Sequence, residues 1–403
     1  MKILVLNTGS SSIKFQLFAM PEQTVLGAGQ LEKIGEEASI VSYRRPNYDE
    51  QNDRWKYEKN ISNHSEGLAE IVSLLLDTEK GVVTSADEIK AVGHRVVHGG
   101  DKFTQPTVIE DDILGQLKSI SYLAPLHNPA GIKGIEVAQE YFDHAIQVAV
   151  FDTAFHQTMP DYAYRYAIPG SFYEEHGLRA YGFHGTSHQY VMRAAARFLE
   201  LPQNEFNAIT IHLGNGCSMT AIREGKCVDT SMGLTPLGGL MMGTRCGDID
   251  PSLLLFLGDH LQMSFDEIDQ LLNKQSGLKG LTGTNDLRSV LSKYEKGDTA
   301  AKLAVAIYVY RIKKYIGAYA AVLGRLDAIV FTAGVGENSS FIRAQVSQEL
   351  QILGVELDPR KNDLPAKGIR EVQSANSPVR VMVVPTNEEL EIANQSYELV
   401  NSR

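Results

Sequence analysis

Two segments far apart in the chain share one pattern, an apolar strand, a short polar turn and a second apolar strand. In the first, residues 3–18, the turn is made of Asn, Thr, Gly and three Ser, and Lys14 follows it. In the second, residues 208–222, the turn reads Gly-Asn-Gly-Cys-Ser. Short apolar runs joined by such residues are typical of β-hairpins. A hairpin that recurs in this way predicts a chain built from two related halves.

Both turns have a composition that suits phosphate binding. Glycine permits close approach of the backbone, whose N–H groups can form a concave nest around phosphate oxygens. Serine hydroxyls and the ammonium group of Lys14 would add further donors. For the first hairpin alone, a polar turn with a solvated lysine is an equally good interpretation. The second hairpin shifts the balance toward phosphate binding.

A third segment, residues 327–339, ends an apolar strand in a glycine-rich turn, and a helical pattern begins at Phe341. A turn of this kind before a helix directs backbone N–H groups toward an anion. The turn lacks the third glycine of the dinucleotide fingerprint, and the P-loop pattern G-x-x-x-x-G-K-[ST] occurs nowhere in the chain. The sequence therefore predicts nucleotide binding without a P-loop.

In this order, the three segments resemble those of the acetate and sugar kinase, heat-shock chaperone and actin superfamily. The resemblance is more specific to the acetokinase family, and it extends over the whole chain. The segments that carry it, besides the glycine-rich turn, are residues 7–14, 94–100, 126–129, 151–156, 182–188, 212–216, 243–248 and 385–389.

The resemblance implies an α/β fold of two duplicated actin-like ATPase domains, with the active site in the cleft between them. Residues 1–152 and 387–403 would form the N-terminal domain, to which the C-terminal helix returns. Residues 153–386 would form the C-terminal domain, which binds the nucleotide and forms a homodimer.

The implied activity is that of a phosphotransferase with a carboxyl group as acceptor. It moves the γ-phosphoryl group of ATP in line and directly to acetate, reversibly, and yields acetyl phosphate and ADP. The cofactor is Mg²⁺, for which Mn²⁺ can substitute. A propionate kinase of the same family is the alternative.

The resemblance also implies roles for the residues of this chain that match the family's functional residues. The catalytic residues would be Asp152, His184, Arg245 and Arg95. The acid-binding residues would be Arg95, Val97, Leu126, Phe183 and Pro236. The ATP-binding residues would be Lys14, His212, Leu213, Gly214, Asn215, Gly216, Asp286, Leu287, Arg288, Gly334, Val335, Gly336, Glu337 and Asn338. The metal-binding residues would be Asn7 and Glu388.

Phosphoryl transfer to a carboxylate needs charge neutralisation more than it needs a base. A small carboxylic acid is ionised near pH 7, because its pKa is about 4–5, so no general base has to deprotonate it. Two anions must be brought together, and Arg95 and Arg245 can bind their oxygens in bidentate fashion. The family often assigns proton transfer to Asp152, but this reasoning favours contact with metal-bound water and orientation of the acceptor. His184 would donate a hydrogen bond to the transferring phosphoryl group.

The expected metal site has few protein ligands, because Mg²⁺ prefers hard oxygen atoms and usually keeps several waters. Glu388 would also suit the first turn of a helix, where a negative charge interacts favourably with the helix dipole. The two roles are compatible.

Val97 is the position that bears on the choice of acid. Its β-branched side chain narrows the pocket relative to the alanine that is typical of propionate-preferring relatives. We therefore expect acetate as the first substrate and propionate as a slower one, since one methylene discriminates by only about 1–3 kcal/mol.

Two other classes of function stay open as weaker alternatives, a metallohydrolase and a chaperone-type nucleotide switch. His94 and His98 read as the end of a strand, where they would lie roughly 13 Å apart, too far for one metal ion. No H-E-x-x-H occurs, and His127, His156 and His188 are predicted to be structural or hydrogen-bonding. A chaperone-type switch would need a peptide-binding module, for which 403 residues leave no room.

The composition predicts a cytoplasmic protein without nucleic-acid or membrane partners. The net charge of −11 disfavours polyanionic surfaces as the main partner. The three cysteines have no C-x-x-C spacing, which indicates a reducing compartment and no structural zinc. Only four apolar residues follow Lys2, too few for a signal-peptide core, and charges interrupt the apolar helix at 303–323.

Strands alternate with helical patterns along the chain, which implies α/β layers. The first 60 residues are predicted to be strand-rich, with turns near residues 36–37 and 45–47. Helices are predicted at 65–75, 111–120, 132–141, 187–199, 265–272, 299–326, 341–353 and 388–400, and further strands at 146–150 and 379–384. Ser187 and Asn387 are the predicted caps of two of these helices.

Overall fold

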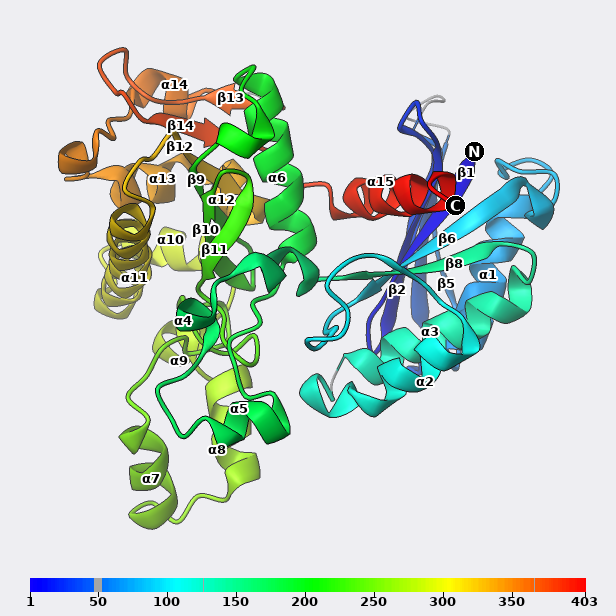
Figure 1. Ribbon diagram of the computed structural model, residues 1–403, viewed down its shortest axis with the longest axis horizontal. Helices are drawn as coiled ribbons and strands as arrows, with labels where there is room; N and C mark the ends of the chain where they lie inside the picture. The colour runs from blue at the N-terminus through cyan, green and yellow to red at the C-terminus, as the bar shows by residue number, and fades with distance from the viewer. Residues whose placement is uncertain (47–52, 126, 366) are drawn as a thin grey trace. The chain divides into compact units, whose positions relative to one another are not determined.

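The computed structural model describes residues 1–46, 53–125, 127–365 and 367–403. The chain divides into two compact units, shown in Figure 1. The first consists of Met1–Phe155 and Asn387–Arg403, and the second of His156–Thr386. Leu126 and the last residue of the turn predicted at 45–47 lie outside the described residues.

The first unit is built on a mixed sheet of eight strands in the order β5-β4-β3-β2-β1-β6-β8-β7. Its strands are β1 (Lys2–Thr8), β2 (Ser12–Ala19), β3 (Thr24–Glu32), β4 (Ser39–Arg44), β5 (Arg54–Lys59), β6 (Ile89–Val96), β7 (Thr107–Val108) and β8 (Ile146–Phe151). Its helices are α1 (His64–Leu76), α2 (Asp111–Ser119), α3 (Asn128–Tyr141) and α15 (Glu388–Asn401).

Alternate residues of β1 belong to two different cores, because successive side chains of a strand point to opposite faces. Leu4 and Leu6 pack in a core with residues of α1 and α3. Ile3 and Val5 pack against Ile392 and Ala393 of α15. Helices therefore cover both faces of the sheet around β1 and β6 (Figure 1).

The second unit is built on a sheet of six strands in the order β11-β10-β9-β12-β14-β13. Its strands are β9 (Ala208–Leu213), β10 (Cys217–Arg223), β11 (Lys226–Thr230), β12 (Ala328–Thr332), β13 (Arg370–Glu371) and β14 (Arg380–Val383). Its helices are α4 (Asp161–Tyr164), α5 (Ser171–His176), α6 (Gly185–Phe198), α7 (Ser252–Asp259), α8 (Phe265–Lys274), α9 (Gly277–Thr282), α10 (Leu287–Glu295), α11 (Thr299–Leu323), α12 (Ala333–Asn338), α13 (Ser340–Ser347) and α14 (Pro359–Asp363).

The two sheets share one topology. Strands β3-β2-β1-β6-β8-β7 and β11-β10-β9-β12-β14-β13 follow the same order in the sequence and in space. In both, the first hairpin and the next strand are antiparallel, the two following strands are parallel, and the last edge strand is antiparallel. The first unit adds β4 and β5 at one edge. This repetition confirms the prediction of duplicated halves from the two hairpins.

The helices that follow the last parallel strands are exchanged between the units. The helix α6 comes after β8 of the first unit but packs on β9 and β12 of the second. The helix α15 comes after β14 of the second unit but packs on β1 and β6 of the first. The C-terminal segment therefore completes the first unit rather than the one that precedes it in the chain.

Most predicted elements are present, and three predictions were wrong. Asn387 does cap α15, since its side chain accepts a hydrogen bond from the N–H of Leu390 at 3.1 Å. Ser187 is not a cap, because α6 begins two residues earlier, after His184. The glycine-rich segment after β12 is itself helical and forms α12 rather than an open turn. The helix predicted at 341–353 ends at Ser347, where the backbone of Gln348 becomes extended.

No helix in the described part of the chain is both long and apolar enough to span a lipid bilayer.

Candidate active site

Three polar side chains of the first unit meet where its parallel strands end. Asn7 lies near the end of β1, Arg95 near the end of β6, and Asp152 directly after β8. Neighbouring parallel strands place their carboxyl ends at the same edge of a sheet, which is where ligands bind in α/β folds. The topology thus gathers these residues from segments far apart in the sequence.

Arg95 is the centre of this cluster. Its Nη2 lies 2.5 Å from Oδ2 of Asp152, and its Nε lies 3.1 Å from both carboxylate oxygens. Its Nη1 donates to the amide oxygen of Asn7 at 3.4 Å. Burial disfavours the charged guanidinium, but the carboxylates of Asp152 and Glu388 outweigh it and raise the pKa of Arg95. The arginine is therefore a permanent cation at this position.

The first turn of α15 adds two glutamates with different surroundings. Glu389 is buried, and its Oε1 lies 2.5 Å from Nζ of Lys14 on β2. The pKa of Glu388 is raised by burial, and Asp152 and Glu389 add to this while Arg95 opposes it. Glu388 therefore interacts with both Arg95 and Asp152, whereas Glu389 is paired with Lys14.

These residues fit a divalent cation. Mg²⁺ prefers carboxylate and amide oxygens, which Glu388, Asp152 and Asn7 provide. Burial and neighbouring carboxylates disfavour the ionised form of Glu388, and a bound cation would reverse that preference. Among the described residues, no three His, Cys, Asp or Glu side chains form a metal-binding group.

The second unit contains a hydrogen-bonded group of histidines around the start of α6. Nδ1 of His184 lies 2.9 Å from Oγ of Ser218, which lies 2.7 Å from Nε2 of His188. Nδ1 of His188 lies 2.7 Å from the hydroxyl of Thr210. The ring of His184 stacks on that of His212, with their centroids 4.3 Å apart. In this arrangement Nδ1 of His184 is occupied by its hydrogen bond with Ser218.

The conformation of His184 depends on the loop before α6. Its φ of 57° lies in the left-handed region, and it occupies the cap position of the helix. Gly182 also has a positive φ, and a Cβ there would come within 2.4 Å of Thr230. Backbone conformations of this kind are uncommon for residues other than glycine and cluster at functional sites.

Gly216, in the turn of the second hairpin, separates His184 from Arg245. A Cβ on Gly216 would lie 3.4 Å from Nε2 of His184 and 3.8 Å from Nη1 of Arg245. Glycine at this position therefore lets an imidazole and a guanidinium approach the same turn. A larger residue would occupy the space beside both.

Arg245 is a partly buried cation with no carboxylate partner among the described residues. Its Nη1 donates to the carbonyl oxygen of Pro236 at 3.4 Å. Burial lowers its pKa, because the charged form loses hydration. A guanidinium in such surroundings is suited to bind an anion from solution.

A pocket of about 740 Å³ opens between the turn after β9 and the start of α12. Gly214, Asn215, Gly334, Val335 and Asn338 line one part of it. The start of α10 lines another, with Asp286, Leu287 and Arg288, and Tyr308 and Leu291 add apolar surface. Its volume lies within the range of small-molecule sites. These are largely the residues that the sequence predicts to bind ATP.

Comparison with known proteins shows the family of this chain. The sequence matches the Acetokinase family over residues 2–394. An acetate kinase of Oleidesulfovibrio alaskensis is 50% identical over 400 residues, which cover 99% of this chain and 100% of that protein. An acetate kinase of Flavobacterium johnsoniae is 49% identical over 402 residues and covers 100% of both.

The chain belongs to the acetokinase family.

Solved structures of acetokinase-family proteins also match the fold. A Porphyromonas gingivalis acetate kinase has a TM-score of 0.93 at 43% identity and covers 99% of both chains. A propionate kinase from Francisella tularensis has a TM-score of 0.91, also at 43% identity, and covers 98% of this chain and 99% of that one. The chain is accordingly an enzyme, a kinase with the two-domain fold of the actin-like ATPases.

The structure distributes the acid-binding residues expected from this family over both units. Val97 lies just after β6 in the first unit and is partly buried. Phe183 and Pro236 lie in the second unit, where Phe183 is buried directly before His184. Leu126 lies outside the described residues.

Several residues that hold the histidine cluster together had no signal in the sequence. The hydroxyl of Ser218 contacts both His184 and His188. The hydroxyl of Ser187 lies 2.8 Å from Nδ1 of His212 and 2.8 Å from the hydroxyl of Thr386. These serines are ordinary polar residues in a strand and a helix, so only spatial neighbours reveal their partners.

A buried arginine behind α12 is another such residue. Arg343 donates from Nη1 to the carbonyl oxygens of Gly336 and Glu337, at 2.9 and 3.0 Å. Its Nε donates to the side-chain oxygen of Asn362 at 2.8 Å. Burial, with a smaller effect of nearby Arg370, lowers its pKa to about 10. Arg343 thus satisfies the carbonyl groups at the end of a helix that lines the large pocket.

The remaining histidines have structural surroundings. His94 is buried beside Gln147, and burial lowers its pKa to about 4. His156 donates from Nε2 to the carbonyl oxygen of Phe183 at 3.0 Å, and burial also lowers the pKa of His188. The contacts of His156 and His188 confirm the prediction that they are hydrogen-bonding residues.

Proposed function

We infer that this protein transfers the γ-phosphoryl group of ATP to acetate, reversibly, to give acetyl phosphate and ADP. The observation that carries this inference is a pair of arginines in acetokinase motifs, Arg95 and Arg245, one at the polar cluster of each unit. Bringing ATP and a carboxylate together requires cations that stabilise both anions and the transferring group. The two arginines supply them.

The geometry of Asp152 supports a positioning role rather than proton transfer. Its carboxylate is 1% exposed and accepts hydrogen bonds from the guanidinium of Arg95 on both oxygens. The acceptor is ionised at neutral pH, so it has no proton to give up. Asp152 orients Arg95 and contributes negative charge beside the proposed metal ion.

The large pocket of the second unit is the proposed ATP site. Leu291 and Tyr308 offer apolar surface to the base, and the Gly-Asn-Gly turn and α12 offer backbone donors to the phosphates. Arg288 forms a bidentate pair with Asp286 at 2.8 and 3.0 Å and is 92% exposed at the rim.

His184 acts as a hydrogen-bond donor through Nε2. When neutral His188 donates from Nε2, Ser218 accepts that bond and donates to Nδ1 of His184. The proton of neutral His184 then sits on Nε2, which faces the Gly216 position, as Nη1 of Arg245 does. A donor held there can stabilise charge that develops on the transferring phosphoryl group.

Asn7 and Glu388 would hold the metal, which is proposed to be Mg²⁺ with Mn²⁺ as a substitute. It would neutralise charge on the phosphate oxygens. Hard oxygen atoms and the burial of Glu388 support this assignment.

Replacing Glu388 with alanine is expected to raise the Mg²⁺ concentration needed for half-maximal activity about tenfold or more. Glu389→Ala is the matched control, because the neighbouring Glu389 is already paired with Lys14, and its effect should be smaller. Mg²⁺ titrations of both variants measure the difference. A larger increase in the Mg²⁺ requirement of Glu389→Ala than of Glu388→Ala would show that Glu389 binds the metal instead.

Val97 is proposed to limit the acid pocket, so Val97→Ala should favour propionate. The change removes about two methyl groups, whose contacts are worth about 1–2 kcal/mol. The ratio of kcat/KM for propionate to that for acetate should rise roughly tenfold. Acetate should lose mainly in KM, because its methyl group loses contacts made in the ground state. An unchanged ratio would mean that Phe183 or Pro236, rather than Val97, limits the size of the acid pocket.

The direct test of the function uses purified protein with ATP, Mg²⁺ and a panel of short acids, and traps acyl phosphate as hydroxamate. Acetate should give the highest kcat/KM. A higher value for propionate would replace acetate as the substrate, and the absence of any acyl phosphate would overturn the proposed function.

We further propose a cytoplasmic homodimer. The described cysteines are unpaired, which suits a reducing compartment. The helix α7 exposes Leu253, Leu254, Leu255 and Phe256. A row of exposed apolar side chains is typical of a protein–protein interface, so this helix is the proposed contact of the second unit.

A further inference from the structure

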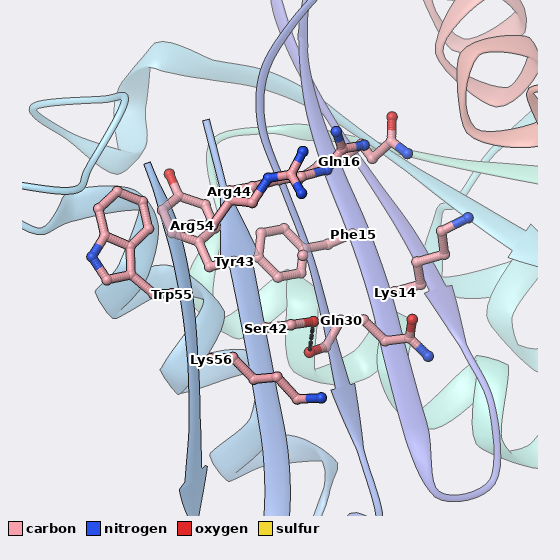
Figure 2. A pocket seen from close by; sticks show the side chains of 12 residues that line it. Lys14, Phe15, Gln16, Gln30, Ser42, Tyr43, Arg44, Arg54, Trp55 and Lys56 are labelled. Carbon is pink, nitrogen blue, oxygen red and sulfur yellow. Dashed lines mark hydrogen bonds between the residues drawn. The ribbon is translucent and has the colours of Figure 1, made fainter. Parts of the chain in front are cut away.

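The sheet of the first unit has a second pocket, of about 350 Å³, to which no role has been assigned. It lies over β2, β3, β4 and β5, and Figure 2 shows its lining. The residues with charged side chains that line it are Lys14, Arg44, Arg54 and Lys56. All four are cations, although the chain carries a net charge of −11.

Strand register places these cations on one face of the sheet. Lys14 pairs with Gln30, Gln30 with Ser42, and Ser42 with Lys56, so they form one row across four strands. Asn7 pairs with Lys14 at the inner end of this row. The pocket therefore continues outward from the polar cluster of the first unit.

Arg44 and Arg54 form the neighbouring row. They are directly opposite each other in the antiparallel pair of β4 and β5, where Cβ atoms lie about 5 Å apart. In Figure 2 both side chains extend across the sheet face toward Gln16. Like charges placed directly opposite each other destabilise a sheet, so an anion bound between them would remove an unfavourable interaction.

Among the described residues, no carboxylate neutralises this pair. Within the described ranges, no carboxylate oxygen lies within 4 Å of Arg44, Arg54 or Lys56, whereas the adjacent Arg45 is paired with Asp53. Glu32 and Glu58 lie on the next row of the same face but do not line the pocket. Of the four cations, Lys14 is the one with an acidic partner in the described part of the chain, Glu389.

We propose that this pocket binds a small oligophosphate, an anion of two or three linked phosphoryl groups. Guanidinium groups bind phosphoryl oxygens in bidentate fashion, and lysines add point charges. The row from Lys14 to Lys56 spans three strand spacings, about 14 Å, which favours several linked charges over a single phosphate. The volume is that of a small-molecule site rather than of a surface for a macromolecule.

This pocket adjoins the proposed catalytic machinery but is lined mainly by other residues. Arg44, Arg54 and Lys56 have no part in the proposed transfer to acetate, and Lys14 alone is common to both. The proposal therefore stands independently of the proposed function.

The single tryptophan of the chain, Trp55, lies on β5 between Arg54 and Lys56. Its ring stacks on Tyr43 on the opposite face of the sheet, so its emission reports on changes in β5 next to the bound anion. Titration of the full-length protein with inorganic triphosphate, without divalent metal, should change the emission of Trp55 to saturation. Isothermal calorimetry should give the same Kd, in the submillimolar range.

Arg44→Gln and Arg54→Gln should each weaken triphosphate binding about tenfold, the usual effect of one lost charge-assisted hydrogen bond. The matched control is Lys90→Gln, which removes one exposed cation from β6 outside the pocket and should leave the Kd unchanged. Arg245→Ala, in the other unit, should also leave the response of Trp55 unchanged. Acyl phosphate formation by Arg44→Gln and Arg54→Gln should stay within about twofold of the wild type.

Four results would overturn the proposal. One is the absence of a saturable response by either method into the millimolar range. Equal affinities of Arg54→Gln and the wild type would place the anion elsewhere. Equal weakening in Lys90→Gln would indicate attraction by net charge alone. Loss of acyl phosphate formation in Arg44→Gln with unchanged triphosphate binding would assign the arginine to catalysis.

Discussion

Arg245→Ala is expected to lower kcat by about three orders of magnitude without unfolding the protein. Removal of a cation that stabilises the transition state of phosphoryl transfer typically costs this much. The guanidinium of Arg245 has no carboxylate partner among the described residues, so its loss leaves no buried acid unpaired. The fold should therefore tolerate the change, which circular dichroism and thermal unfolding would verify.

Arg245→Lys should restore little activity, since an ammonium group cannot reproduce the planar, bidentate hydrogen bonding of a guanidinium group. Arg360→Ala is a suitable control, because Arg360 is an exposed arginine of the same unit on α14. Its kcat should equal that of the wild type. Near-wild-type turnover of folded Arg245→Ala would remove this residue from the proposed site.

Arg95→Ala is expected to lower kcat by about 10²–10³-fold and to destabilise the first unit as well. The reason for the second effect is Asp152, which is 1% exposed and loses its counter-ion. Breaking a buried ion pair in this way costs about 3–5 kcal/mol. Chemical denaturation would measure the stability and the hydroxamate assay the activity.

The double variant Arg95→Ala, Asp152→Asn separates the two effects. It removes the unpaired charge, so stability should largely return while activity stays low. If activity returned together with stability, Arg95 would act only through the fold. If neither single nor double variant lost activity, the arginine would have no place in the reaction.

The two hairpins and the third strand were predictable because their pattern is local. Short runs rich in apolar residues define β1, β2, β9 and β10, and their turns are marked by Gly, Asn and Ser. The cap of α15 was predictable for the same reason, since Asn387 and its partner Leu390 are three residues apart. Such features depend on neighbours within a few positions of the chain.

Helix boundaries were less predictable where tertiary contacts compete with local preference. Ser187 has the composition of a cap, yet its hydroxyl lies 2.8 Å from His212 and from Thr386 in the folded chain. The glycines after β12 suggest an open turn, but Arg343 bonds the carbonyl groups of Gly336 and Glu337 and thereby supports a helix. The partners of Ser187 lie 25 and 199 residues away, and Arg343 lies seven residues beyond Gly336, outside the glycine-rich segment.

The sequence by itself determined the duplicated architecture, the family and the residue types of the site. Tertiary structure alone decided the pairing of those residues: Arg95 with Asp152, Lys14 with Glu389, and His184 with Ser218. It also placed Arg44 opposite Arg54 on an open sheet face. The physical reason is that strand and helix patterns arise from neighbours along the chain, whereas these contacts join strands and helices that only folding brings together.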